Sequence, residues 1–123
     1  MDPSRLVSRK CEPCRGGLPP LAEVEAKEFL EQTPEWTLEE NASRLARRFE
    51  FENFKSALEF VNRVGDLAEQ EGHHPDIAIH WNKVELVLWT HAIGGLHEND
   101  FILAAKIDRL LEEPRRATSG LAG

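Results

Sequence analysis

The stretch between Asn53 and Gly72 constrains the fold of this chain most, because it predicts one long amphipathic helix. Apolar residues recur there at intervals of three and four positions: Phe54, Ala57, Leu58, Val61, Val64 and Ala68. On a helix this spacing forms a single apolar stripe, which another layer of the protein must cover. Asn53 is a preferred N-cap residue and Gly72 a preferred C-terminal cap, so we expect the helix to begin and end there.

Segments on both sides of this helix alternate apolar and polar residues, as strands with one buried face do. Before the helix, the alternation covers residues 43–51, and residues 36–40 are expected to pair with it through a turn at Asn41. After the helix, residues 76–81 and the segment from Val84 onward are expected to form a second hairpin. Two further helices are predicted at 21–32, where Pro34 follows the end, and at 99–111.

The resulting order, α-β-β-α-β-β-α, predicts an α+β fold. We expect a four-stranded antiparallel sheet with three helices packed on one face. The other face is then partly bare, with Trp81, Val87 and Trp89 on or near it. Exposed apolar surface of this kind is typical of contacts between subunits, so we expect a homodimer or a homotetramer.

The predicted domain occupies residues 21–111, and the chain on either side of it is expected to be irregular. Residues 1–20 contain four prolines and a Gly-Gly pair, which predicts an irregular N-terminal arm. This arm carries the Cys-x-x-Cys pair of Cys11 and Cys14, and two exposed thiols are the expected state. A zinc half-site and a redox pair are the other interpretations of the spacing. Residues 112–123 are predicted to form a flexible tail.

Charge and hydropathy argue against two classes of partner. The chain has 15 Lys and Arg against 22 Asp and Glu, a formal net charge of −7, and no basic run longer than two residues. Such a surface repels phosphate backbones, so no nucleic acid is expected as a partner. No stretch approaches the ~18 apolar residues of a membrane span, and the N-terminus lacks the apolar core of a secretory signal. We therefore expect a cytoplasmic protein that binds no membrane.

The histidines are the residues best suited to chemistry in this chain. His73 and His74 directly follow the predicted helix cap and precede a proline, and His91 follows a predicted strand. If the strand that begins at Asp76 pairs with the strand that ends at Thr90, both histidine sites lie at the same end of a hairpin. An imidazole titrates near ~6.5 and exchanges a proton at neutral pH, so the pattern favours a proton-transferring cluster.

Two other interpretations of the histidines stay open. A histidine pair after a helix can act as a positively charged cap at its C-terminal end. Three imidazoles can also hold a catalytic zinc ion. However, adjacent histidines seldom direct both rings to one metal, and the His-Glu-x-x-His spacing is absent. No metal is expected at these residues.

Three segments resemble those of pterin-4a-carbinolamine dehydratases. They are residues 69–76 with the sequence Gly-His-His-Pro-Asp at their end, the Asn-Lys-Val segment at 82–84, and the Thr-His pair at 90–91 followed by Gly95, Leu96 and Asp100. The resemblance extends over roughly residues 18–111 and includes residue types, spacing and element order. It implies the fold predicted above.

The resemblance implies an enzyme that dehydrates a small-molecule pterin, a 4a-hydroxytetrahydropterin, to the quinonoid dihydropterin without a metal or another cofactor. Carried over by position, His73 and His91 form the acid–base pair, His74 binds and orients the pterin, and Glu69 holds an imidazole. The substrate-binding residues that it implies are Pro75, Thr90, Ala92, Ile93 and Asp100. Family members often have an acidic residue at the position of Ala92, and a Ser or Thr helix cap at that of His97.

A second function is implied by a subgroup of the same family. Trp89 and the run from Glu98 to Asp108 resemble dehydratase-like proteins, some of which assist Rubisco assembly in carboxysome operons and chloroplasts. Under this alternative the chain is a catalytically silent assembly factor, and Rubisco subunits are its partners. The retained His73, His74 and His91 favour the enzyme.

Overall fold

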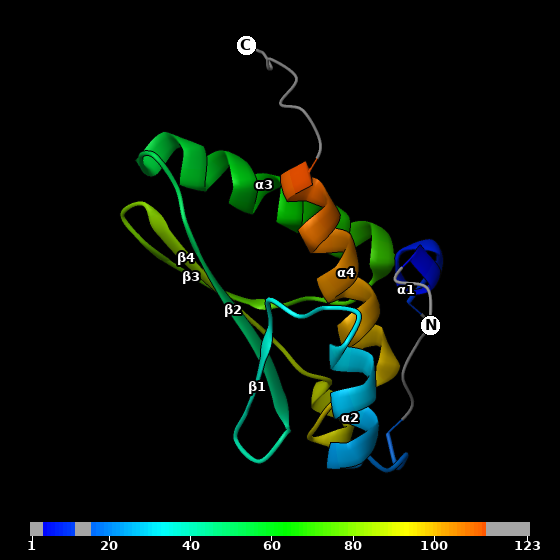
Figure 1. Cartoon of the computed structure of the whole chain (residues 1–123). Coiled ribbons are helices and arrows are strands. Elements are labelled where there is room, and N and C mark those ends of the chain that lie inside the picture. Colours follow the sequence, from blue (N-terminus) through cyan, green and yellow to red (C-terminus); the bar gives the residue numbers. More distant parts are fainter. Residues whose placement is uncertain (1–3, 12–15, 113–123) are drawn as a thin grey trace.

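The computed structural model describes residues 4–11 and 16–112 of the chain as one antiparallel sheet with helices packed on one face (Figure 1). The helices are α1 (Ser4–Ser8), α2 (Glu23–Leu30), α3 (Phe54–Glu71) and α4 (Glu98–Glu112), with a short 3-10 helix η1 (His91–Ile93). The strands are β1 (Thr37–Glu39), β2 (Arg44–Glu50), β3 (Asp76–His80) and β4 (Lys83–Leu88). The predicted α+β class and the element order from α2 to α4 are confirmed.

Helix α3 has the caps that its sequence predicts. The Asn53 side chain accepts a hydrogen bond of 2.8 Å from the backbone N–H of Ser56. At the other end Gly72 has a φ of 67°, and the N–H groups of Gly72 and His73 both donate to the Ala68 carbonyl. This left-handed turn ends the helix and leads the chain directly into the histidine pair.

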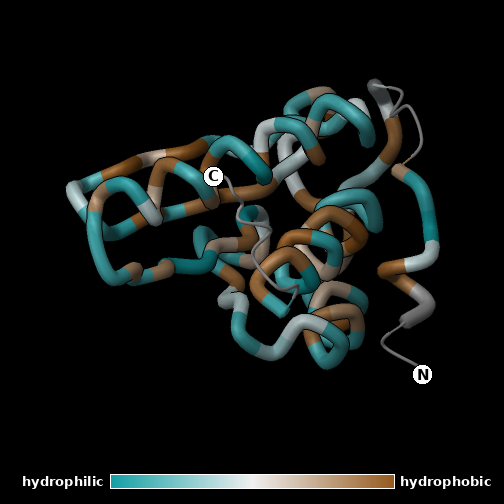
Figure 2. Tube along the Cα trace, turned by 90° about the horizontal axis from the view of Figure 1, so that it is seen from above, coloured by the Kyte–Doolittle hydropathy of each residue, from teal (hydrophilic) through white to brown (hydrophobic). Residues whose placement is uncertain are grey.

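The sheet has the strand order β1-β2-β4-β3, and every neighbouring pair is antiparallel. Val84, Leu86 and Leu88 of β4 are fully buried and belong to the core that the helices cover, whereas the alternate residue Val87 is only half-buried. Figure 2 shows hydrophobic and hydrophilic residues alternating along the helices, as elements with one buried stripe require. Trp81, in the β3–β4 turn, is 67% exposed. The homodimer or homotetramer stays a prediction.

The N-terminal segment differs from the prediction. The sequence predicts an irregular arm over residues 1–20, but the structure has α1 within it, in contact with α4, and Leu6 of α1 is buried. Cys11 is buried as well, where an exposed thiol is expected, and Cys14 lies outside the described residues. A five-residue helix is too short to show a periodicity, and tertiary contact, not propensity, stabilises it.

The C-terminal boundary shifts by one residue. Glu112, the first residue of the predicted tail, is the last residue of α4, and residues 113–123 lie outside the described part.

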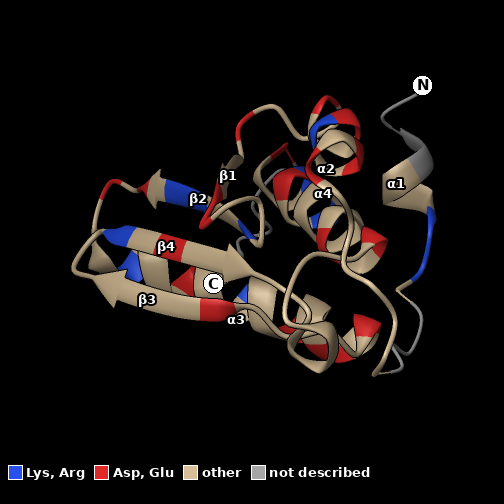
Figure 3. Ribbon diagram, turned by 90° about the horizontal axis from the view of Figure 1, so that it is seen from below, with Lys and Arg blue, Asp and Glu red and all other residues tan. Residues whose placement is uncertain are grey.

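In the view of Figure 3, basic residues are interspersed with acidic ones over the sheet and the helices. Within residues 4–11 and 16–112, no helix is both long and apolar enough to cross a membrane.

Candidate active site

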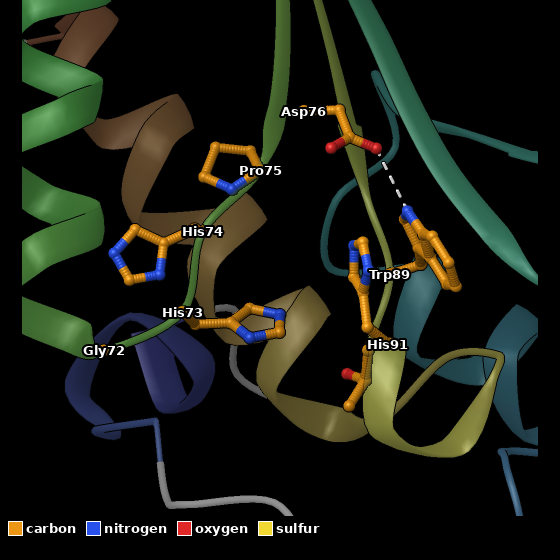
Figure 4. Close-up of a pocket in the computed structure, with 8 residues that line it drawn as sticks. Gly72, His73, His74, Pro75, Asp76, Trp89 and His91 are labelled. Carbon is orange, nitrogen blue, oxygen red and sulfur yellow. Dashed lines mark hydrogen bonds between the residues drawn. The ribbon is translucent and has the colours of Figure 1, made fainter.

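A pocket of about 350 Å³ lies where α3 leads into β3 and β4 leads into η1 (Figure 4). Antiparallel pairing of β3 and β4, with Asp76 opposite Val87, brings the two histidine segments to the same end of the hairpin. The pocket is lined by Gly72, His73, His74, Pro75, Asp76, Trp89, Thr90 and His91. Its volume lies at the lower end of the ~300–1,000 Å³ typical of small-molecule sites, which suits a compact ligand.

The buried carboxylate of Asp100 holds the His73 ring in place. The ring points toward His91 (Figure 4), and its Nε2 lies 2.6 Å from Oδ1 of Asp100. The His73 side chain is 13% exposed and Asp100 is fully buried. Because a carboxylate oxygen accepts, Nε2 carries the proton of this bond, and Nδ1 is the ring nitrogen left for a ligand.

Asp100 has a different place from the one predicted for it. Predicted as a substrate-binding residue, it is not among the residues that line the pocket. Its Oδ2 accepts hydrogen bonds of 2.9 Å from the Thr90 hydroxyl and from the backbone N–H of His97. His97 Nδ1 in turn accepts from the N–H of Asn99 at 3.0 Å. Together these bonds satisfy backbone N–H groups at the start of α4, with an imidazole in the capping role that Ser or Thr usually has.

His74 lies at the margin of the site. Figure 4 shows its ring on the opposite side of the chain from the His73 ring, because successive residues of an extended segment project to opposite sides. The residue before a proline favours this extended conformation. Glu69 does contact an imidazole, that of His74, with 2.6 Å between Oε2 and Nε2. Both side chains are largely exposed, at 77% and 62%, so solvent screens this pair strongly.

The segment after β4 supplies three lining residues, Trp89, Thr90 and His91. Thr90 is buried and is fixed by its hydroxyl bond to Asp100 and by a bond of 2.8 Å from its N–H to the carbonyl of Gly95. The chain then turns into η1, so Ala92 and Ile93, predicted to bind substrate, are not among the lining residues.

Three lining residues, Gly72, Asp76 and Trp89, are missing from the site predicted by sequence. The indole Nε1 of Trp89 donates to Oδ2 of Asp76 at 3.0 Å. The Trp89 and His91 rings stack with centroids 3.7 Å apart and an angle of 24° between their planes. The contact between Trp89 and Asp76 could have been predicted from the alternation along β4. Trp89 follows Val87 by two residues and therefore lies on the same sheet face, and Val87 is the strand partner of Asp76.

In the described part of the chain, no group of three or more His, Cys, Asp and Glu side chains is arranged to hold a metal ion. His73 and His74 contact separate carboxylates, Asp100 and Glu69. The arrangement is suited to moving protons to and from a bound ligand, since three imidazoles border one pocket.

A family model described as "Pterin 4 alpha carbinolamine dehydratase" matches residues 19–110. Proteins of Methylococcus capsulatus and Chlorobium luteolum, which carry the provisional name pterin-4-alpha-carbinolamine dehydratase, are 51% and 52% identical to this chain. The first alignment covers 92% of this chain and 99% of that protein, and the second covers 88% and 96%.

Two solved structures share the fold. One is a transcriptional coactivator/pterin dehydratase from Brucella melitensis, with a TM-score of 0.70 and 30% identity over 74% of this chain and 97% of that one. The other, a pterin dehydratase-like RuBisCO assembly factor of the alpha-carboxysome, has a TM-score of 0.56 and 23% identity over 65% and 93%. The family model covers most of the chain, the fold is shared, and the relatives are about half identical over most of its length. The chain therefore belongs to the pterin-4-alpha-carbinolamine dehydratase family of lyases.

Proposed function

We propose that this chain dehydrates 4a-hydroxytetrahydropterins, with His73 and His91 as the groups that transfer protons. The observation that carries the proposal is that both imidazoles border one pocket and each is fixed by a different neighbour. His73 is bonded to the buried Asp100, and His91 is stacked on Trp89. Family membership supplies the substrate class, a pterin.

The reaction balances with protons alone. One imidazolium gives a proton to the C4a hydroxyl, and the C4a–O bond breaks with loss of water. The other, neutral imidazole removes a proton from a ring nitrogen, whose electron pair forms the new carbon–nitrogen double bond. Nothing is oxidised or reduced overall, so two histidines suffice as acid and base and no metal is required. At His73 the exchange takes place at Nδ1, because Asp100 holds the proton on Nε2.

Three other lining residues, His74, Pro75 and Thr90, position the ligand. His74 and Pro75 border the pocket on the side of α3, and Thr90 borders it on the side of η1. Glu69 restrains the exposed His74 ring, which can then contact a pterin at the margin without taking part in proton transfer. We therefore expect His74 to contribute to binding more than to the rate of the chemical step.

The test measures how fast the purified protein consumes chemically generated 4a-hydroxytetrahydropterin, followed by absorbance. We expect the wild type to exceed free imidazole at equal concentration, and His73→Ala and His91→Ala each to lose about a hundredfold in kcat. His80→Ala is the matched control, because His80 is exposed, as His91 is, but lies at the far end of β3. A wild-type rate equal to that of imidazole, or an equal loss in the control, contradicts the proposal.

Only a shared fold supports the alternative function, assistance of Rubisco assembly. The carboxysome assembly factor is 23% identical to this chain, whereas the relatives named as dehydratases are about half identical over most of the length. We therefore do not extend the assembly function to this chain.

A further inference from the structure

We propose that Trp89 is the positioning residue for His91, and that Asp76 and Arg44 hold the Trp89 ring in place for this purpose. The inference rests on the proposed function, because it assigns the groups that orient one member of the acid–base pair. It treats Trp89 as a residue that acts through His91 and not as one that exchanges protons itself.

His91 needs an orienting contact because it is exposed. A histidine side chain in solvent has several rotamers open to it, and only some of them direct a ring nitrogen at a ligand in the pocket. The stack of His91 on Trp89, with 3.7 Å between centroids and 24° between planes, holds the imidazole face to face with the indole. In Figure 4 the stacked His91 ring stands opposite the His73 ring.

Trp89 can serve as this support because it is itself held at two points. Its Nε1 donates to Asp76 at 3.0 Å, which fixes the rotation of the indole about its own side-chain bonds. The Arg44 guanidinium carbon lies 3.6 Å from the centroid of the indole ring, a cation–π contact. Arg44 is in turn fixed by bonds from its Nη1 to the carbonyl and the hydroxyl of Ser43, at 2.9 and 3.2 Å.

The strand register explains why these side chains meet. Leu45 lies opposite Leu88, so the residues just outside that pair, Arg44 and Trp89, face each other across β2 and the end of β4. Asp76 lies on the third strand, diagonally across from Trp89 on the same sheet face. The two catalytic imidazoles are thus oriented by separate layers, His73 by the hydrogen bond that it donates to Asp100 of α4 and His91 by a stack on Trp89, which the sheet supports.

The first arm of the test uses NMR and needs no activity. A ring stacked on an indole has its proton resonances shifted upfield, and the His91 signals are identified by their loss in His91→Ala. We expect Trp89→Leu to abolish the upfield shift, Trp89→Phe to keep part of it, and Asp76→Ala to reduce it. His91 signals that stay in place in Trp89→Leu overturn the proposal, whether or not the protein is a dehydratase.

The second arm measures kcat and KM. Trp89→Leu should lower kcat about tenfold with KM unchanged, because misorientation of a reacting group affects the chemical step. Asp76→Ala should lower kcat about threefold, whereas Asp76→Asn, whose amide oxygen still accepts from the indole, should restore it. In the Trp89→Leu background, Asp76→Ala should have no further effect.

Two outcomes overturn the role of Asp76. If Asp76→Ala lowers kcat equally in the Trp89→Leu background, or if Asp76→Ala and Asp76→Asn both raise KM, then Asp76 contacts the pterin directly. The midpoint of thermal unfolding is the control, and in the Asp76 variants it should stay near that of wild type because Asp76 is exposed.

Discussion

Nε2 of His73 lies 2.6 Å from Oδ1 of Asp100, and this carboxylate is fully buried at the start of α4. The same side chain accepts from the Thr90 hydroxyl and from the backbone of His97. One buried aspartate thus joins the end of α3, the end of β4 and the N-terminus of α4 below the pocket.

We expect Asp100→Asn to lower kcat about a hundredfold while the protein stays folded. The Asp100 carboxylate accepts from three donors: Nε2 of His73, the Thr90 hydroxyl and the His97 N–H. In the amide one of the two oxygens is replaced by an NH2 donor, so it cannot accept from all three and keep the proton on Nε2 of His73. Asp108→Asn is the matched control. Asp108 is a largely buried carboxylate on the same helix, but it accepts hydrogen bonds from Trp36 and Arg47, away from the pocket. Equal kcat values for the two variants would contradict this role of Asp100.

Arg47 and Arg48 are neighbours in sequence, but their substitutions should differ in effect. Arg47 lies 2.6 Å from Asp108 in a largely buried pair, and Arg47→Ala leaves that carboxylate without its cation. We expect a loss of about 2 kcal/mol in the free energy of unfolding, measured by urea denaturation. Arg48 makes ion pairs in solvent, at 63% exposure, so Arg48→Ala should cost less than about 0.5 kcal/mol. Similar losses would show that the Arg47 pair adds nothing beyond a surface contact.

Glu71 should make stability depend on pH in the acid range. Burial raises the pKa of this carboxyl, but hydrogen bonds from Lys106 and the Cys11 N–H, with the charges of Lys106 and Lys10, outweigh it and lower the pKa below its ordinary 4.5. A lowered pKa in the folded state contributes stability above about pH 4.5, and this contribution is lost as the pH falls through the folded value. The difference in unfolding free energy between wild type and Glu71→Gln should therefore be largest at neutral pH and shrink in acid. A difference that grows on acidification would contradict the sign.

Cys11 should resist alkylation in the folded protein. Burial and the nearby Glu71 carboxylate raise the pKa of its thiol to about 12, so almost no thiolate forms near neutral pH. The thiol lies 3.5 Å from the Asn99 carbonyl, in a buried contact. We expect iodoacetamide to modify Cys11 only after addition of denaturant, as read by tandem mass spectrometry, which separates it from Cys14. Labelling at the same rate with and without denaturant would contradict the buried position.

The helices and strands between Glu23 and Glu112 could be predicted because their signals are local. The caps of α3 at Asn53 and Gly72 depend on the residues themselves, and the alternation along β2 and β4 needs no partner to be visible. Helix α1 could not be predicted in this way, because Leu6 becomes a core residue only when the segment packs on α4.

The sequence by itself determined that the two histidine segments meet: once two hairpins and a capped helix are specified, antiparallel pairing brings His73 and His74 to the same end of the sheet as His91. Tertiary structure alone decided what each of these residues contacts. Asp100 is buried under His73, and Trp89 supports His91, through contacts between elements far apart in the chain. Residue type and spacing determine local conformation. Side-chain orientation and burial depend instead on which layers pack together, and that packing exists only in the folded chain.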